Sequence, residues 1–268
     1  MKILIIGGGN MGQTYARGFL KSHIVQASQL IILEKSPEKA EQLKSLEIGR
    51  VVGTPGTYIK EVDLIVLAVK PQDTDRLFSS IKAYIDPQQL ILSIMAGVKL
   101  DTIREGLGAT KIIRAMPNLP AQIGIGMTVY TSSEEVTRIE LVTVQNLLSA
   151  SGKTIYVERE PMINAATAIS GSGPAYVFYF MKSLIESAKD MGFTQSEAEL
   201  LTYQTFRGAV DLFNKYDITC EEWIEKVSSR GGTTEAAIQG FHQKSVELGF
   251  KHGVIAALTR AEELAKQG

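Results

Sequence analysis

Residues 1–12 read Met-Lys-Ile-Leu-Ile-Ile-Gly-Gly-Gly-Asn-Met-Gly, a short apolar run that passes directly into a glycine-rich turn. The glycines at positions 7, 9 and 12 match the G-x-G-x-x-G pattern. In that pattern the first glycine makes a tight turn, the second lets the backbone approach a pyrophosphate, and the third lets a helix pack on a strand. The helix then directs its amino terminus toward the anion. The stretch therefore predicts a dinucleotide-binding unit at the start of the chain.

An acidic residue at the expected distance supports this interpretation. Glu34 ends the second apolar run, 22 residues after Gly12, and about 20 residues is typical of a carboxylate that binds ribose hydroxyls. Such a carboxylate accepts hydrogen bonds from a 2′-hydroxyl and repels a 2′-phosphate, which favours NAD. Lys35 and Ser36 follow and could bind that phosphate if Glu34 turns away. The choice between NAD and NADP stays open, as does a role for Glu34 as an ordinary solvated carboxylate.

Up to about residue 158, short apolar runs alternate with helical patterns, which indicates β-strands joined by helices into a parallel sheet with both faces covered. The expected strands are Lys2–Ile6, Leu30–Leu33, Asp63–Val69, Leu90–Ile94, Lys111–Arg114, Met127–Tyr130 and Thr154–Val157. From Pro161 onward nearly every segment has a helical pattern. The expected helices there include Ala198–Tyr216, Thr234–Leu248 and Gly253–Lys266. Two capping boxes, Thr194-x-x-Glu197 and Thr219-x-x-Glu222, lie on either side of the first of these helices. We therefore expect a doubly wound, mostly parallel α/β domain of the Rossmann type over residues 1–160, then an all-α domain over 161–268.

Composition excludes several classes of protein. Lys plus Arg is 28 and Asp plus Glu is 29, so the net charge of −1 gives no electrostatic basis for binding nucleic acid. The apolar runs are shorter than the roughly 18 residues of a membrane span, and the first run breaks into glycines too early for a secretory signal. The single cysteine, Cys220, and three scattered histidines predict neither a disulfide nor a metal site. A cytoplasmic protein is expected.

Three loops follow predicted strands at the edge of the sheet where open α/β folds bind ligands. They are Ala68-Val69-Lys70-Pro71-Gln72, Ser93-Ile94-Met95-Ala96-Gly97 and Ala115-Met116-Pro117-Asn118-Leu119-Pro120-Ala121. Small residues and prolines make such loops stiff and close-fitting, which suits a flat nicotinamide ring. Each loop alone could be ordinary turn chemistry, but three at one edge favour a ligand site.

Two glycine segments interrupt the helical half. Residues 170–174, Ser-Gly-Ser-Gly-Pro, predict a kink, a new helix start or the place where the helical half meets the cofactor. Residues 227–235 end one helix and begin another, so Gly231, Gly232, Thr233 and Thr234 could present free amides to a carboxylate. A simple helix–turn–helix hinge with a threonine cap is the alternative.

Taken in order, these motifs resemble those of the pyrroline-5-carboxylate reductases, the enzymes of the last step of proline biosynthesis. The resemblance extends over essentially the whole chain. It rests on Gly7–Gly12, Ala68–Gln72, Met116-Pro117-Asn118-x-Pro120-Ala121, Ser170–Tyr176 and Ser229-x-Gly231-Gly232-Thr233-Thr234. It implies a Rossmann domain and a helical domain that interlocks two subunits into a homodimer, which can assemble further.

The resemblance also assigns roles to residues. Together with Glu34, the NAD(P)H contacts would be Ile6, Gly7, Gly8, Gly9, Asn10, Met11, Ser36, Ala68, Val69, Lys70, Pro71, Met95, Ala96, Gly97 and Asn118. Gly231, Gly232 and Thr233 would hold the substrate carboxylate, and the Thr234 hydroxyl would orient the ring nitrogen. Lys226 stands where some members carry an amide side chain that touches the product. Arg230 replaces the family's usual proline, and Leu119 replaces a common threonine.

The reaction expected from this resemblance is hydride transfer from NADH or NADPH to the C=N carbon of a small cyclic imine, 1-pyrroline-5-carboxylate, giving L-proline. A protonated imine is already electrophilic, so no metal is required, and Thr234 is the catalytic candidate through orientation and not as an acid. A β-hydroxyacid dehydrogenase or a reductase of another imine is an alternative. Lys70 could serve a dehydrogenase, but no lysine or histidine lies between Pro161 and Tyr179. A non-catalytic dinucleotide sensor is a third hypothesis, against which the intact Gly231–Thr234 segment argues.

Overall fold

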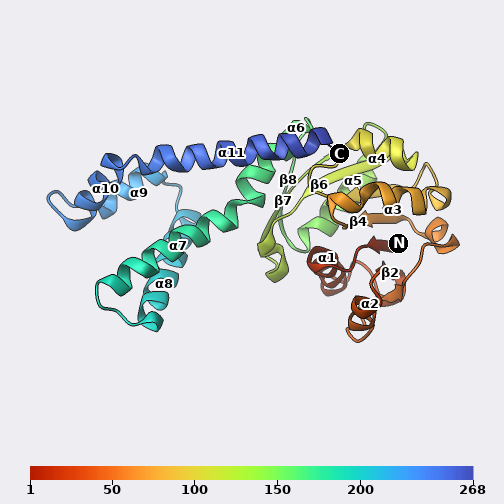
Figure 1. Cartoon of the computed structure of the whole chain (residues 1–268), viewed down its shortest axis with the longest axis horizontal. Helices are drawn as coiled ribbons and strands as arrows, with labels where there is room; N and C mark the ends of the chain where they lie inside the picture. The colour runs from red at the N-terminus through yellow and green to blue at the C-terminus, as the bar shows by residue number, and fades with distance from the viewer. Residues whose placement is uncertain (268) are drawn as a thin grey trace. The chain divides into compact units, whose positions relative to one another are not determined.

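A computed structural model describes residues 1–267 of the chain (Figure 1). The chain divides into two compact units. The first comprises Met1–Ser172 together with the end of the chain from Ala257, and the second comprises Gly173–Ala256. No helix among the described residues is long and apolar enough to cross a membrane.

The first unit is built on an eight-stranded sheet with the strand order β3-β2-β1-β4-β5-β6-β7-β8. The strands are β1 (Ile3–Ile6), β2 (Leu30–Leu33), β3 (Arg50–Val52), β4 (Leu64–Leu67), β5 (Leu90–Ser93), β6 (Ile112–Met116), β7 (Gly126–Ser132) and β8 (Gly152–Tyr156). Among the strands of the described residues, only β6 and β7 pair antiparallel. The expected doubly wound, mostly parallel sheet is confirmed. All seven predicted strands are present, and β3 was not predicted.

Helices cover both faces of this sheet, as the alternation of side chains along β1 shows. Ile3 and Ile5 belong to one apolar core, and Leu4 and Ile6 belong to the other. Helices α1 (Asn10–Lys21) and α5 (Arg138–Ser149) contribute to the first core, and α3 (Thr74–Ile81) and α4 (Leu100–Leu107) contribute to the second. A strand buried on both sides requires this continuous apolar composition. The strand order reverses between β2 and β4, on either side of β1, which is where such folds bind dinucleotides.

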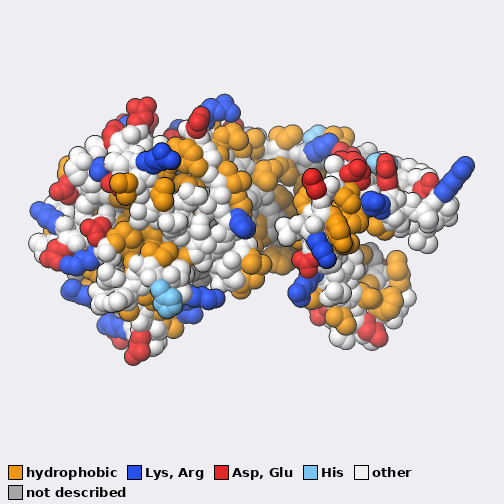
Figure 2. Space-filling model, turned by 180° about the vertical axis from the view of Figure 1, so that it is seen from behind, with side chains coloured by type: hydrophobic (Ala, Val, Ile, Leu, Met, Phe, Trp, Pro, Cys, Tyr) orange, Lys and Arg blue, Asp and Glu red, His pale blue; other side chains and the backbone are white. Residues whose placement is uncertain are grey.

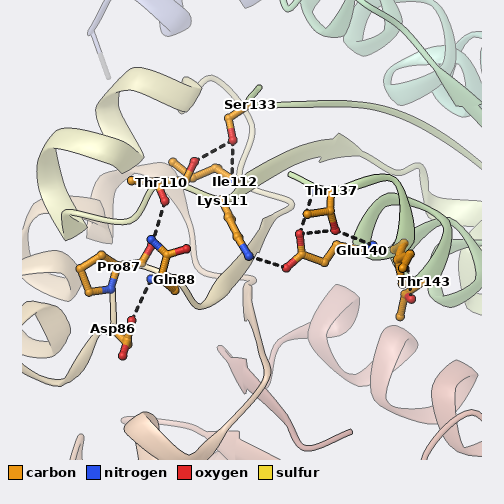
Figure 3. A network of polar contacts seen from close by, with 11 residues as sticks. Asp86, Pro87, Gln88, Thr110, Lys111, Ile112, Ser133, Thr137, Glu140 and Thr143 are labelled. Atoms are coloured by element: carbon orange, nitrogen blue, oxygen red, sulfur yellow. Dashed lines mark hydrogen bonds and ion pairs between the residues drawn. The ribbon is translucent and has the colours of Figure 1, made fainter. Parts of the chain in front are cut away.

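A polar network ties the start of β6 to the start of α5 (Figure 3). The Lys111 Nζ donates to Glu140 Oε1 at 2.9 Å, and the hydroxyl and amide of Thr137 donate to Glu140 Oε2. Ser133 adds a further link by accepting from the Ile112 amide. Partial burial by itself raises the pKa of Glu140, but the hydrogen bonds from Lys111 and Thr137 outweigh it and lower this pKa below its ordinary value.

The chain is almost entirely helical after β8. The helices are α6 (Pro161–Ala166), α7 (Gly173–Asp190), α8 (Gln195–Lys215), α9 (Cys220–Val227), α10 (Thr233–Gln243) and α11 (Val246–Gln267), with a π-helical turn at Thr167–Gly171. Both predicted capping boxes are formed. One boundary was wrong: the break between the last two helices lies at Ser245, not near residues 249–252. Ser245 has a φ of +53°, a left-handed conformation that ends α10, while Gly249 and Gly253 lie inside α11.

The helices of the second unit leave many large apolar side chains exposed. Figure 2 shows hydrophobic side chains gathered over this helical part. Those exposed on α7 and α8 include Val177, Phe178, Tyr179, Leu184, Leu200, Leu201, Val210 and Phe213. Exposed apolar side chains in this number are typical of a surface that another molecule covers.

Candidate active site

The glycine turn after β1 has the geometry that close approach of a ligand requires. Gly7 has a φ of +106°, and a Cβ there would lie 2.6 Å from the Ala68 carbonyl oxygen. A Cβ at Gly12 would overlap the Gly7 carbonyl, so the helix packs directly on the turn. A Cβ at Gly9, by contrast, would meet no described atom within 4 Å. The turn is therefore closed at Gly7 and Gly12 and open at Gly9, where the G-x-G-x-x-G pattern places a pyrophosphate.

A cavity of about 360 Å³ lies beside this turn, at the ends of β1, β2 and β4. It is lined by Ile6, Gly7, Gly9, Leu33, Glu34, Lys35, Lys39, Gly53, Pro55, Ala68, Val69, Lys70, Asp73, Arg76, Leu77 and Ser80. Seven of the predicted cofactor residues are among them: Ile6, Gly7, Gly9, Glu34, Ala68, Val69 and Lys70. The charged residues Lys39, Asp73 and Arg76 were not predicted. These residues fit a dinucleotide, because an open glycine turn adjoins a cavity rich in cations.

Glu34 is buried, with 7% of its surface exposed, so it is not an ordinary solvated carboxylate. Its Oε2 accepts from the Gly8 amide at 2.9 Å, and its Oε1 accepts from the Ser36 amide at 2.9 Å. The Ser36 hydroxyl in turn caps the helix α2 (Pro37–Lys44) by accepting from the Lys39 amide. The carboxylate thus connects the glycine turn to the start of α2.

Asp73 is the counter-charge for the cations of the cavity. The Lys35 Nζ lies 2.6 Å from Asp73 Oδ1. This hydrogen bond lowers the pKa of Asp73 below its ordinary value, and the positive charges of Arg76 and Lys70 act in the same direction. No sequence pattern singles out Asp73, which lies in the short turn Pro71–Asp73 before α3.

The predicted Met95–Gly97 loop lies outside this cavity and is held by packing. The Met95 side chain is only 2% exposed and belongs to an apolar core. Gly97 has a φ of +77°, and a Cβ there would lie 3.2 Å from the Leu264 Cβ in the last turns of α11. The backbone of this loop, and not the Met95 side chain, is therefore what remains for a cofactor to contact.

The Asn118 side chain is committed to the protein itself. Its Nδ2 donates to the Ser170 carbonyl at 3.1 Å, and its Oδ1 accepts from the Met127 amide at 2.8 Å. In an α-helix the Ser170 carbonyl would accept from residue 174, but Pro174 has no N–H. The break expected at residues 170–174 is a π-helical turn, closed by a bond from the Ser172 amide to the Thr167 carbonyl at 2.8 Å.

In the second unit, residues 229–235 form a tight turn into α10. The Gly232 amide donates to the Ser229 carbonyl at 2.9 Å, and Gly231 has a φ of +72°, which is the pattern of a type II turn. The cap of α10 is Gly232, so the alternative of a hinge with a threonine cap lacks its cap. The first amides of a helix have no partner within the helix and are available to an anion.

Besides Gly232, a second amide of this turn already has a partner. The Gly231 amide donates to Glu235 Oε2 at 2.6 Å. Glu235 was not predicted, because a glutamate in the first turn of a helix is a common stabilising feature. Thr234 is half-buried in the first turn of α10, and Lys226 is exposed in the last turn of α9. Among the described residues, no group of three or more His, Cys, Asp and Glu side chains could hold a metal ion.

Two known families match parts of the chain. The family described as pyrroline-5-carboxylate reductase dimerisation matches residues 160–264, and the family described as NADP oxidoreductase, coenzyme F420-dependent, matches residues 2–97. The pyrroline-5-carboxylate reductase of Aquifex aeolicus is 33% identical over 100% of this chain and 97% of its own. That of Pseudomonas aeruginosa is 32% identical over 99% of this chain and 97% of its own.

Solved structures agree with these sequence relatives. A pyrroline-5-carboxylate reductase from Coxiella burnetii superposes with a TM-score of 0.89 at 31% identity, over 98% of each chain. The pyrroline carboxylate reductase of Plasmodium falciparum with NADP bound superposes with a TM-score of 0.88 at 26% identity, over 99% of this chain and 98% of its own. The glycine turn, the helical half and these relatives agree, and the chain belongs to the pyrroline-5-carboxylate reductase family.

Proposed function

We propose that this chain reduces the C=N bond of 1-pyrroline-5-carboxylate to L-proline with a hydride from NADH or NADPH, the final step of proline biosynthesis. The observation that carries the proposal is the cavity beside the open glycine turn, in a chain that is similar over its whole length to reductases of this name.

Orientation accounts for most of the chemistry. The nicotinamide, when bound, supplies the hydride. The ring nitrogen of the protonated imine already carries its proton, so the chain needs to hold the C=N carbon close to the hydride, which is worth about 7–11 kcal/mol in favourable cases. The turn formed by Gly231, Gly232 and Thr233 binds the substrate carboxylate with the help of the α10 dipole. The Gly231 and Thr233 amides donate to the carboxylate, because the Gly232 amide is held by the Ser229 carbonyl. Thr234 orients the ring nitrogen, and Glu235 yields the Gly231 amide when the substrate binds.

The assembly we infer is a homodimer formed through the helical domain, residues 161–268, with further association of dimers. The exposed apolar side chains of α7 and α8 support this, because a second copy would remove them from water. The near-neutral net charge of −1 argues against a nucleic-acid partner. We place the enzyme in the cytoplasm, where amino-acid biosynthesis takes place.

The test is the oxidation of NADH and NADPH in the presence of 1-pyrroline-5-carboxylate, with wild type, Thr234→Ala and Thr143→Ala. The Thr143 hydroxyl bonds only the Ile139 carbonyl of its own helix, so Thr143→Ala is the matched control. Loss of a hydrogen bond to a charged group costs about 1.5–3 kcal/mol, so kcat/KM should fall about ten- to hundredfold in Thr234→Ala alone. A folded wild-type protein that binds either dinucleotide and oxidises neither would refute the proposal.

A further inference from the structure

We propose that the buried carboxylate of Glu34 makes this chain select NADH over NADPH. The inference rests on the dinucleotide cavity of the proposed function and concerns the ribose end of that cavity. Glu34 follows the last residue of β2 and lines the cavity. In dinucleotide-binding folds this position meets the adenosine ribose, whose 2′ oxygen is a hydroxyl in NADH and carries a phosphate in NADPH.

The carboxylate is fixed in place. Both of its oxygens accept backbone amides at 2.9 Å, one from Gly8 and one from Ser36. Turning away from the cavity would break two charge-assisted hydrogen bonds and leave both amides unpaired. Lys35 and Ser36 could bind a 2′-phosphate only if Glu34 turned away from the cavity. The two hydrogen bonds of Glu34 oppose that movement.

A fixed carboxylate still serves a ribose diol. Each carboxylate oxygen has two lone-pair positions, and each oxygen of Glu34 has one amide donor, so each can accept one more hydrogen bond. A 2′-hydroxyl donates to such an oxygen. A 2′-phosphate carries a charge of about −1.5 to −2 and has only acceptor oxygens near neutral pH, so it repels the carboxylate.

The cations of the cavity do not outweigh the repulsion between Glu34 and a 2′-phosphate. Lys35, Lys39, Lys70 and Arg76 all have exposed side chains, whereas Glu34 is buried, and charges in water are screened more strongly than buried ones. Lys35 is paired with Asp73 at 2.6 Å, and Asp73 also attracts Lys70 and Arg76.

The experiment measures binding without turnover. NADH and NADPH are titrated into the protein by the fluorescence of the reduced nicotinamide, and each complex is then competed with 5′-AMP and 2′,5′-ADP, which differ by the 2′-phosphate. Variants are Glu34→Gln and the control Glu38→Gln, an identical substitution at an exposed residue of α2 that does not line the cavity.

Wild type should bind NADH at least about tenfold more tightly than NADPH, and 5′-AMP should compete better than 2′,5′-ADP. The preference should fall severalfold or reverse in Glu34→Gln and persist in Glu38→Gln. Because Glu34→Gln could also loosen the glycine turn, Glu34→Asp serves as a second variant: it keeps the charge and should keep the preference for NADH. Equal or tighter binding of NADPH by wild type, or an unchanged ratio in Glu34→Gln, would overturn the proposal. These titrations need no imine, so they test the proposal independently of catalysis. A protein that selects NADH through Glu34 but does not reduce pyrroline-5-carboxylate would refute the proposed function and leave the selection of NADH intact.

Discussion

Replacing Glu160 with glutamine is expected to lower the free energy of unfolding of the first unit by about 3 kcal/mol, because it removes the counter-charge of a buried arginine. The Arg114 side chain is 2% exposed, and its Nη1 lies 2.7 Å from Glu160 Oε1. The same oxygen accepts from the Leu100 amide at 2.9 Å, so Glu160 also caps α4. One residue therefore holds the sheet, the start of α6 and the start of α4 together.

The size of the expected loss of stability depends on the contacts that Arg114 keeps in Glu160→Gln. Removing one partner of a buried ion pair costs about 3–5 kcal/mol, since the other charge is left uncompensated. The Glu160 side chain is 24% exposed, and the Arg114 Nη2 keeps a bond of 3.1 Å to Asn164 Oδ1, so the lower end of this range applies. The Arg114 Nε has no hydrogen-bond partner among the described residues, so no further acceptor is at hand to compensate.

The assay is urea denaturation followed by far-UV circular dichroism at one fixed protein concentration. Glu158→Gln, at an exposed residue of the same segment, is the control and should change stability by less than about 0.5 kcal/mol. Amide hydrogen exchange at Leu100 should accelerate in Glu160→Gln only. The double variant Arg114→Met with Glu160→Gln should recover at least about 1 kcal/mol, because it removes the stranded charge. A double variant no more stable than Glu160→Gln would show that the stranded charge is not the source of the cost.

Three further changes test the backbone and the charges. Arg230→Pro should raise stability by about 0.4–1 kcal/mol in thermal melts, because Arg230 precedes Gly231 in the type II turn, at a position that favours proline; a lower melting temperature would contradict this geometry. Gly97→Ala should destabilise by about 1–3 kcal/mol more than Gly108→Ala in the same denaturation assay. Both glycines have positive φ, but only at Gly97 would the new Cβ press on α11, so equal costs would argue against that contact. Since the folded chain lowers the pKa of Glu140, its contribution to stability is present above the unfolded value of 4.5 and is lost as the pH falls through the folded value. Wild type should therefore be more stable than Glu140→Gln at neutral pH, and the two should converge in acid.

The fold was predictable where one segment alone determines it. The apolar runs at β1 and β2 have both faces buried, so their composition alone identified them, and β2 matched to the residue. The strand β3 was missed because it has only three residues, Arg50–Val52, between Gly49 and Gly53, and pairs only with β2. A strand of three residues is too short to show a periodicity of apolar residues. Its pairing with the neighbouring strand β2 is what defines it as a strand.

The candidate site divides in the same way. The glycine turn could be predicted because its geometry depends only on neighbouring residues. A backbone that turns tightly and lets a ligand approach closely requires glycine. The role of Asn118 was not predictable, because its partner, the Ser170 carbonyl, lies 52 residues further along the chain. That carbonyl needs a donor from outside its helix because Pro174 has no N–H to offer it. Asp73 was missed for a related reason: an aspartate before a helix is common, and its pairing with Lys35 depends on β2 and β4 flanking β1.

Glu34 shows why the spacing of a motif leaves cofactor choice open. A carboxylate 22 residues after Gly12 favours ribose binding but does not exclude a side chain exposed to solvent, since the distance along the chain is the same in both cases. What separates the two is the register of β1 and β2, in which Ile6 lies opposite Leu33. This register brings Glu34, the next residue, to the glycine turn, where the Gly8 amide can hold it. A one-residue slip would point the side chain to the opposite face of the sheet. The strand pairing brings Glu34 to the Gly8 amide, and the Ser36 amide holds its other oxygen, so the carboxylate is fixed in the wall of the cavity.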